Sequence, residues 1–278
     1  MTESDPGPGP RPPRGPDSDA EPGGGTDRSA PAANDLRALR IEVVIVLAVT
    51  FGMSAVTATL QLIDFVLRGL AGQQVALNPR RSYFDVIDLG LNLAAVGQLV
   101  AWGALAVYLL WRSGWSPASI GLTRFRPGAD LLGGLGLAAL IGIPGLALYL
   151  AARALGLSAS VVPTELSDTW WRIPVLILAA FANGWAEEVI VVGYLLTRLG
   201  QLGFGSRTSL LLSSLLRGAY HLYQGFGAGL GNLAMGLVFG YVWQRSGRLW
   251  PLILAHGLID TVAFVGYALL AGRLGWLS

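Results

Sequence analysis

The chain of 278 residues contains no cysteine and no lysine, and it has only two histidines. Without cysteine it cannot form a disulfide, a cysteine nucleophile or a thiolate metal site. All 19 basic residues are arginines, and they are scattered between apolar segments instead of gathering on one face, which argues against nucleic-acid binding. Charged residues make up 13% of the chain and hydrophobic residues 53%, a balance that excludes an ordinary soluble domain.

Several apolar runs are long enough to cross a bilayer, which takes about 20 residues. The expected spans cover residues 41–67, 89–111, 131–152, 173–197, 208–223, 228–244 and 250–270. The segment 153–172 mixes charged residues with Trp170 and Trp171, a composition typical of the headgroup region. The sequence therefore predicts an all-α fold, a polytopic membrane helix bundle of about seven transmembrane helices, with eight as the upper count.

Residues 1–36 differ from the rest of the chain, because this segment is rich in proline and glycine and has no aromatic residue. Such a segment cannot bury enough apolar surface to offset the entropy of ordering, so we expect a disordered tail without the apolar core of a signal peptide. With the tail in the cytoplasm, twelve arginines fall on cytoplasmic segments and six on the opposite side. This bias predicts an integral membrane protein with a cytoplasmic N-terminus. The arginine-only basic usage favours a bacterial plasma membrane.

Ionisable residues are concentrated in the last apolar runs. From residue 169 onwards the acidic residues are Glu187, Glu188 and Asp260, and both histidines, His221 and His256, also lie in apolar runs. A charged group near the bilayer centre costs roughly 3 kcal/mol. One buried histidine is ordinary in a helix bundle. Five buried ionisable groups, however, would destabilise a bundle in which they had no function. The set predicts an active site inside the membrane.

The spacing of these residues suits hydrolysis by an activated water molecule. His256 and Asp260 are four residues apart and share a helix face, as do Arg217 and His221. A carboxylate can take a proton from water, a histidine can share it, and Arg217 or a histidine can donate to the developing oxyanion. Peptide hydrolysis by this route needs no covalent nucleophile.

The order of these groups resembles the CAAX protease and bacteriocin-processing family of intramembrane proteases, which is also called abortive-infection-like and includes the type II CAAX prenyl endopeptidases. The resemblance rests on Ala186-Glu187-Glu188 with Gly193 and Tyr194 downstream, then His221, then His256 with Asp260 four residues later, and it covers roughly residues 125–270. It implies N-terminal transmembrane helices over residues 37–124 and a catalytic transmembrane core over residues 125–278.

The resemblance also implies roles for individual residues. Glu187 matches the glutamate that activates water, with His221 helping to hold the water, and Glu188 matches a second glutamate that orients the site. His256 and Asp260 match the pair that stabilises the oxyanion in relatives with asparagine at the last position. Asp260 complicates this role, because an ionised carboxylate repels an oxyanion. It would have to be protonated, orient His256 or act as a ligand.

Two further positions depart from the family pattern. The family has an arginine where this chain has Val192, and a phenylalanine where this chain has Arg217. A guanidinium inside a span needs a carboxylate partner. We therefore hypothesise that Arg217 replaces the missing arginine from a neighbouring helix by pairing with Glu188. In the alternative, Arg217 reaches the membrane interface and the family activity is lost.

The expected partners are the lipid bilayer and a hydrophobic or lipidated peptide or membrane-protein substrate, with no nucleic acid. The activity would be that of an endopeptidase, either glutamate-dependent or a zinc metalloprotease. If zinc is used, His221, His256 and Glu187 are the candidate ligands, although the helical His-Glu-x-x-His arrangement is absent. The alternatives are a non-catalytic bacteriocin-immunity or abortive-infection-type binding protein and a proton-coupled transporter. The polar residues Asn183, Asn232 and Gln224 are expected to serve helix contacts.

Overall fold

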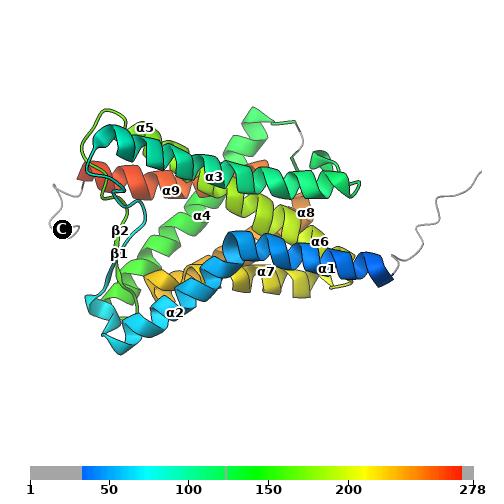
Figure 1. The fold of residues 1–278 in the computed structure, drawn as a ribbon, viewed down its shortest axis with the longest axis horizontal. Helices are drawn as coiled ribbons and strands as arrows, with labels where there is room; N and C mark the ends of the chain where they lie inside the picture. Colours follow the sequence, from blue (N-terminus) through cyan, green and yellow to red (C-terminus); the bar gives the residue numbers. More distant parts are fainter. Residues whose placement is uncertain (1–32, 123, 271–278) are drawn as a thin grey trace, which may run out of the picture.

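The computed structural model describes residues 33–122 and 124–270, and in this part the chain is a bundle of helices with one small sheet (Figure 1). The helices up to residue 112 are α1 (Ala33–Leu47), η1 (Ala48–Gly52), α2 (Met53–Leu67), η2 (Leu70–Gly72) and α3 (Asp85–Arg112). The remaining helices are η3 (Pro117–Ile120), α4 (Pro127–Ala154), α5 (Arg172–Glu187), η4 (Glu188–Tyr194), α6 (Leu195–Gln201), α7 (Ser206–Tyr220), η5 (Leu222–Gln224), α8 (Phe226–Ser246) and α9 (Trp250–Leu270).

The expected all-α membrane bundle is confirmed. In the described part of the chain six helices are long and apolar enough to cross a membrane: Asp35–Leu67, Asp85–Arg112, Pro127–Ala154, Arg172–Gln201, Phe226–Ser246 and Trp250–Leu270. The span expected at residues 208–223 corresponds to α7, whose 15 residues extend about 22 Å and fall short of a bilayer core of roughly 30 Å. The predicted tail falls mostly on residues 1–32, outside the described residues, and helix α1 begins at Ala33.

A parallel two-stranded sheet closes the end of the bundle opposite the start of α1. Strand β1 (Gln74–Ala76) pairs in register with β2 (Ser160–Val162). Figure 1 shows both strands near the C-terminal end of α9. An antiparallel bridge between Ser158 and Gly225 connects the same region to the turn after α7. The segment expected at headgroup level therefore contains β2, with Trp171 buried and Trp170 exposed.

Partly buried ion pairs stabilise the end of the bundle at which α1 starts. Arg198 lies 2.7 Å from Glu42 and donates to Ser113 at 2.8 Å, so it links α6 to α1 and to the end of α3. Arg248 lies 2.6 Å from Asp130 and ties the loop before α9 to the start of α4. Arg248 donates hydrogen bonds to both carboxylate oxygens of Asp130, from Nε and from Nη2. These bonds raise the pKa of Arg248 above its ordinary value.

Two helical segments contain wide π turns, in which each backbone N–H reaches one residue further back than in an α-helix. The first is η1, where the backbone of Thr50 leaves helical geometry between α1 and α2. The second is η4, which interrupts the long helix Arg172–Gln201 directly after Glu187. Such turns occur frequently at functional sites. Here the second one begins at the glutamate pair.

Glycines allow α5 and α9 to cross with their backbones in contact. A Cβ atom added at Gly184 would lie 3.0 Å from the nitrogen of Gly257 and 3.1 Å from the oxygen of Ile253. A Cβ at Gly257 would lie 2.5 Å from the ring of Phe181. Small residues permit this close approach of membrane helices, and it brings the histidine of α9 against the glutamates of α5 and η4.

Replacing Gly184 with valine should force α5 and α9 apart. Because the added atoms meet backbone that cannot rotate away, we expect the free energy of unfolding to fall by about 1–3 kcal/mol. Thermal unfolding of the detergent-solubilised chain measures the change. Gly136→Val is the matched control, since a Cβ there meets nothing within 4 Å. Equal unfolding temperatures for the two variants would show that the crossing is not tightly packed.

Candidate active site

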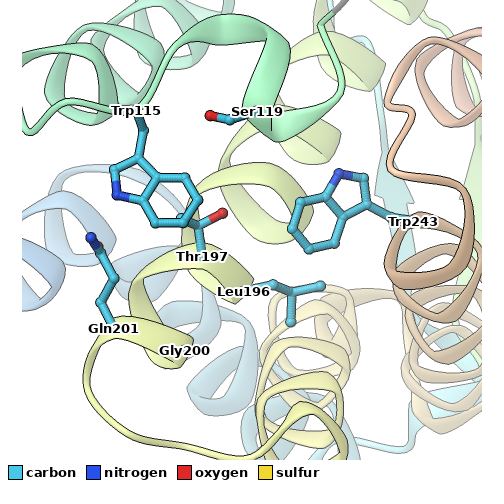
Figure 2. Close-up of a pocket in the computed structure, with 7 residues that line it drawn as sticks. All are labelled: Trp115, Ser119, Leu196, Thr197, Gly200, Gln201 and Trp243. Atoms are coloured by element: carbon cyan, nitrogen blue, oxygen red, sulfur yellow. The ribbon is translucent and has the colours of Figure 1, made fainter. Parts of the chain in front are cut away.

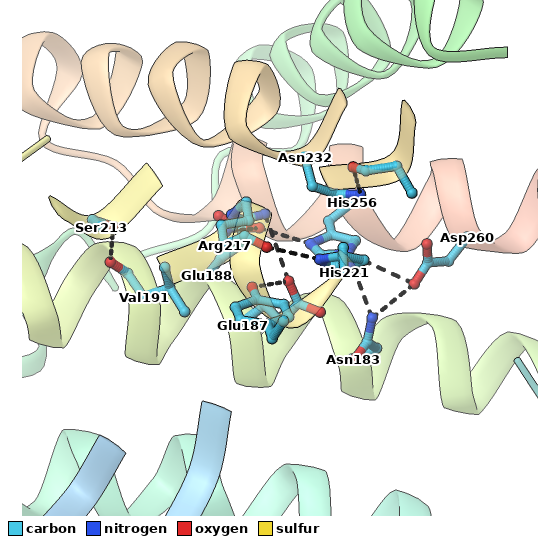
Figure 3. A network of polar contacts seen from close by, with 12 residues as sticks. Asn183, Glu187, Glu188, Val191, Ser213, Arg217, His221, Asn232, His256 and Asp260 are labelled. Carbon is cyan, nitrogen blue, oxygen red and sulfur yellow. Dashed lines mark hydrogen bonds and ion pairs between the residues drawn. The ribbon is translucent and has the colours of Figure 1, made fainter. Parts of the chain in front are cut away.

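Glu187 and Glu188 lie in the middle of the bundle. They stand near the centre of the 30-residue helix Arg172–Gln201, about 22 Å from either end. Glu187 is 3% exposed and Glu188 is fully buried. All seven residues of η4 are buried, and Ser213 of α7 donates to the backbone oxygen of Val191 within it at 2.6 Å (Figure 3). The glutamate pair is therefore buried within the bundle.

Glu188 connects two other helices through one oxygen atom. Its Oε1 accepts a hydrogen bond from Nη2 of Arg217 at 2.8 Å and lies 2.7 Å from Nδ1 of His256. The contact expected between Arg217 and Glu188 is present, and both side chains are fully buried. Because a carboxylate only accepts, an ionised Glu188 requires the proton of His256 to be on Nδ1. Helices α7 and α9 thus meet at a single carboxylate (Figure 3).

Glu187 is held by Tyr220, which sequence reasoning missed. The hydroxyl of Tyr220 donates to Oε2 of Glu187 at 2.5 Å, and Nη1 of Arg217 lies 3.7 Å from the same oxygen. The Tyr220 ring is stacked on Phe51 of η1, with ring centroids 4.9 Å apart. An uncharged aromatic residue in an apolar run looks like a core residue in sequence. The signal that could have indicated Tyr220 is its position directly before His221 in the sequence.

His221 lies at the end of α7, next to Tyr220 in the chain. It follows the last residue of α7, and its Nδ1 lies 3.0 Å from the backbone oxygen of Arg217. Because that oxygen only accepts, Nδ1 carries a proton and Nε2 is the nitrogen left for chemistry. The ring lies 4.7 Å from that of Tyr220. Tyr220, and not His221, makes the direct hydrogen bond to Glu187.

Asp260 meets a residue that was expected to serve only helix contacts. Its Oδ2 lies 3.7 Å from Nε2 of His256 and accepts a hydrogen bond from Nδ2 of Asn183 at 3.0 Å. The same Asn183 nitrogen lies 3.5 Å from Nε2 of His256. Asn183 thereby joins α5 to α9, which is a helix contact of the expected kind, and it also belongs to the polar network. Asn232 does remain with its own helix, where it donates to the oxygen of Ala228 at 3.1 Å.

The proposed zinc ligands do not fit a metal ion. Among the described residues no group of three or more histidine, aspartate and glutamate side chains is arranged to hold one. Each histidine could offer a metal only its Nε2, because Nδ1 of His256 faces Glu188 and Nδ1 of His221 faces a backbone oxygen. The guanidinium of Arg217 lies beside both glutamates, where its charge would repel a dication. The site already contains its own cation.

A surface pocket lies apart from this network. It has a volume of about 340 Å³ and is lined by Trp115, Ser119, Leu196, Thr197, Gly200, Gln201 and Trp243 (Figure 2). Figure 2 shows Trp115 and Trp243 on its two sides. None of the ionisable residues of the network lines the pocket. The pocket therefore contributes nothing to the candidate site.

The fold and the network together define a polytopic membrane protein with a buried glutamate site. Residues 169–262, about a third of the chain, match the family model described as Type II CAAX prenyl endopeptidase Rce1-like. This segment includes every residue from Glu187 to Asp260. This match supports the CAAX protease family expected from the order of the motifs. No curated protein and no solved structure matches the chain.

Replacing Tyr220 with phenylalanine should remove the only hydrogen-bond donor that the described side chains offer to Oε2 of Glu187 at short range. A hydrogen bond to a charged group contributes about 1.5–3 kcal/mol. If Glu187 acts as a base in peptide hydrolysis, we expect the rate of that hydrolysis to fall roughly 10-fold or more. The rate is measured with equal amounts of variant protein in membranes.

Tyr149→Phe is the control, because the Tyr149 hydroxyl also has a partner, the backbone nitrogen of Val161 at 3.1 Å, but lies away from the glutamates. An equal effect of both substitutions would mean that Tyr220 contributes only to stability.

Proposed function

We propose that the chain is an intramembrane endopeptidase of the CAAX protease and bacteriocin-processing family. In this proposal it hydrolyses a peptide bond of a lipidated or hydrophobic substrate with water activated by Glu187. The observation that carries the proposal is the pair of buried glutamates, held separately by Tyr220 and by His256 with one arginine between them. We also propose that it lies in a bacterial plasma membrane with its N-terminus in the cytoplasm.

The two glutamates have different surroundings, and this difference supports different roles. Glu188 is engaged by Arg217 and His256 on one oxygen, which suits an orienting residue. Glu187 is held through Oε2 by Tyr220, and its side chain lies 3.7 Å from Arg217, the arginine of the network. A carboxylate fixed through one oxygen can use the other to take a proton from water.

The proposed reaction then follows from ordinary peptide hydrolysis. Glu187 takes a proton from water as the water oxygen bonds to the substrate carbonyl carbon. The negative charge that develops on the carbonyl oxygen requires N–H donors on the α9 side of the site, where His256 lies. The carbon–nitrogen bond breaks as the proton on Glu187 passes to the leaving amine. No covalent intermediate with the protein is needed.

The depth of the site supports a hydrophobic substrate. A scissile bond must come within hydrogen-bond distance of Glu187, about 22 Å from either end of its helix. Burying an unfolded polar peptide at that depth leaves its backbone groups unsatisfied, whereas apolar side chains or a lipid chain favour entry. We propose a peptide of that kind or a membrane protein segment as the substrate.

The test is a comparison of peptides released from membranes that contain the wild-type chain or Glu187→Gln. Loss of the general base should lower product formation by about 10²–10⁴-fold, while the variant keeps the shape of the side chain. Glu165→Gln, at an exposed loop position, is the matched control and should behave as wild type. Mass spectrometry of the membrane peptides measures the products.

An immunity-type binding protein would keep its protective function in Glu187→Gln and show no product that depends on Glu187. That outcome would overturn the proposal.

Since the donor set does not fit a metal, we also expect product formation to survive a zinc chelator. Elemental analysis of the purified protein should find no stoichiometric zinc.

A further inference from the structure

The N–H groups of Arg217 lie beside the two glutamates, and on the α9 side of the site the network has few N–H donors for an oxyanion. Nδ1 of His256 is directed at Glu188, 2.7 Å away, so this histidine can offer a substrate only its Nε2 side. Asp260 lies next to that nitrogen and has no N–H to offer when ionised. Stabilisation of a developing oxyanion needs preorganised donors, and one such donor contributes about 10²–10³-fold in rate. A neutral donor beside His256 would meet this requirement.

Asn183 is that donor. It stands on α5 one helical turn before Glu187, so both side chains lie on one face of the helix. Its Nδ2 lies 3.0 Å from Oδ2 of Asp260 and 3.5 Å from Nε2 of His256. The carboxamide nitrogen has two hydrogens, and Asp260 accepts one of them. At 3.5 Å the second contact is long for a hydrogen bond, which leaves that hydrogen available to another acceptor.

The surroundings of Asn183 agree with contact to a substrate. The glutamates are enclosed, but Asn183 is only partly buried and the Asp260 side chain is 18% exposed, so the network is accessible on this side. The close crossing at Gly184 and Gly257 fixes the two helices that carry Asn183 and Asp260. Figure 3 shows the amide directed from α5 toward the space between His256 and Asp260.

We propose that Asn183 is a further catalytic residue, which donates its second N–H to the substrate carbonyl oxygen as that oxygen becomes negative. Asp260 is then a positioning residue, because its Oδ2 accepts the first N–H and sets the orientation of the amide. In this chain the amide comes from the glutamate helix and the carboxylate from the last helix. The inference rests on the proposed peptidase function.

The experiment compares three forms of the full-length chain in proteoliposomes: wild type, Asn183→Leu, and the exchange Asn183→Asp with Asp260→Asn. Asn183→Leu keeps the number and branching of the side-chain heavy atoms and removes both N–H groups, so product formation should fall about 100-fold. The exchange keeps one amide and one carboxylate in contact and should recover much of that loss. Asn183→Asp alone places two carboxylates together and should be inactive.

Asn232→Leu is the control for loss of a partly buried asparagine, since Asn232 bonds only within its own helix among the described contacts, and it should retain the wild-type rate. Full activity of Asn183→Leu, or an equal loss in Asn232→Leu, would overturn the inference and leave the proposed function standing. If wild type and Glu187→Gln give the same peptides, the proposed function fails and the inference fails with it.

A second measurement covers the case in which Asn183→Leu folds poorly. A hydrophobic peptide aldehyde, whose hydrate is tetrahedral, should bind wild type and the exchange variant at least 10-fold more tightly than the corresponding peptide alcohol. Asn183→Asp alone should lose this preference. Equal preference for the aldehyde in all three proteins would show that the amide does not contact the oxyanion.

Discussion

The ion pair between Arg217 and Glu188 is the contact on which the rest of the site depends. Both side chains are fully buried inside a membrane bundle, where an unpaired charge costs several kcal/mol. Arg217 also lies 3.7 Å from Glu187, so one cation offsets parts of both negative charges. His256 completes the arrangement by facing the same Glu188 oxygen. Three helices are thereby held together at the point where the chemistry is proposed.

Backbone features place these side chains where the ion pair can form. The π turns of η4 begin at Glu188 and change the helical register directly after the glutamates. Helix α7 is too short to cross the bilayer and ends beside Glu187, which puts Tyr220 and His221 at the site. The glycine crossing of α5 and α9 brings His256 to Glu188. In Figure 3 the polar side chains converge from these separate helices.

The sequence predicted the features that depend on charge in an apolar setting. The intramembrane site and the contact between Arg217 and Glu188 follow from the cost of charge in lipid, which leaves few arrangements open, whereas the family was expected from a resemblance in the order of the motifs. The roles of Tyr220 and Asn183 could not be predicted in this way. Their side chains are neutral and common in helix packing, and their partners lie 33 and 77 residues away in the chain. The π turns were also invisible, since a run such as Val189–Val192 is apolar in either helical register.

The most direct test of this account is a double-mutant cycle on Arg217 and Glu188, read as thermal unfolding of the purified chain in detergent. Arg217→Met and Glu188→Gln should each destabilise the protein by about 3–5 kcal/mol, because each removes the partner that lies 2.8 Å from a buried charge. The double variant should be more stable than either single variant, since it contains neither charge. Additive losses, with the double variant least stable of all, would contradict the claim that Arg217 is the internal counter-ion around which the site is built.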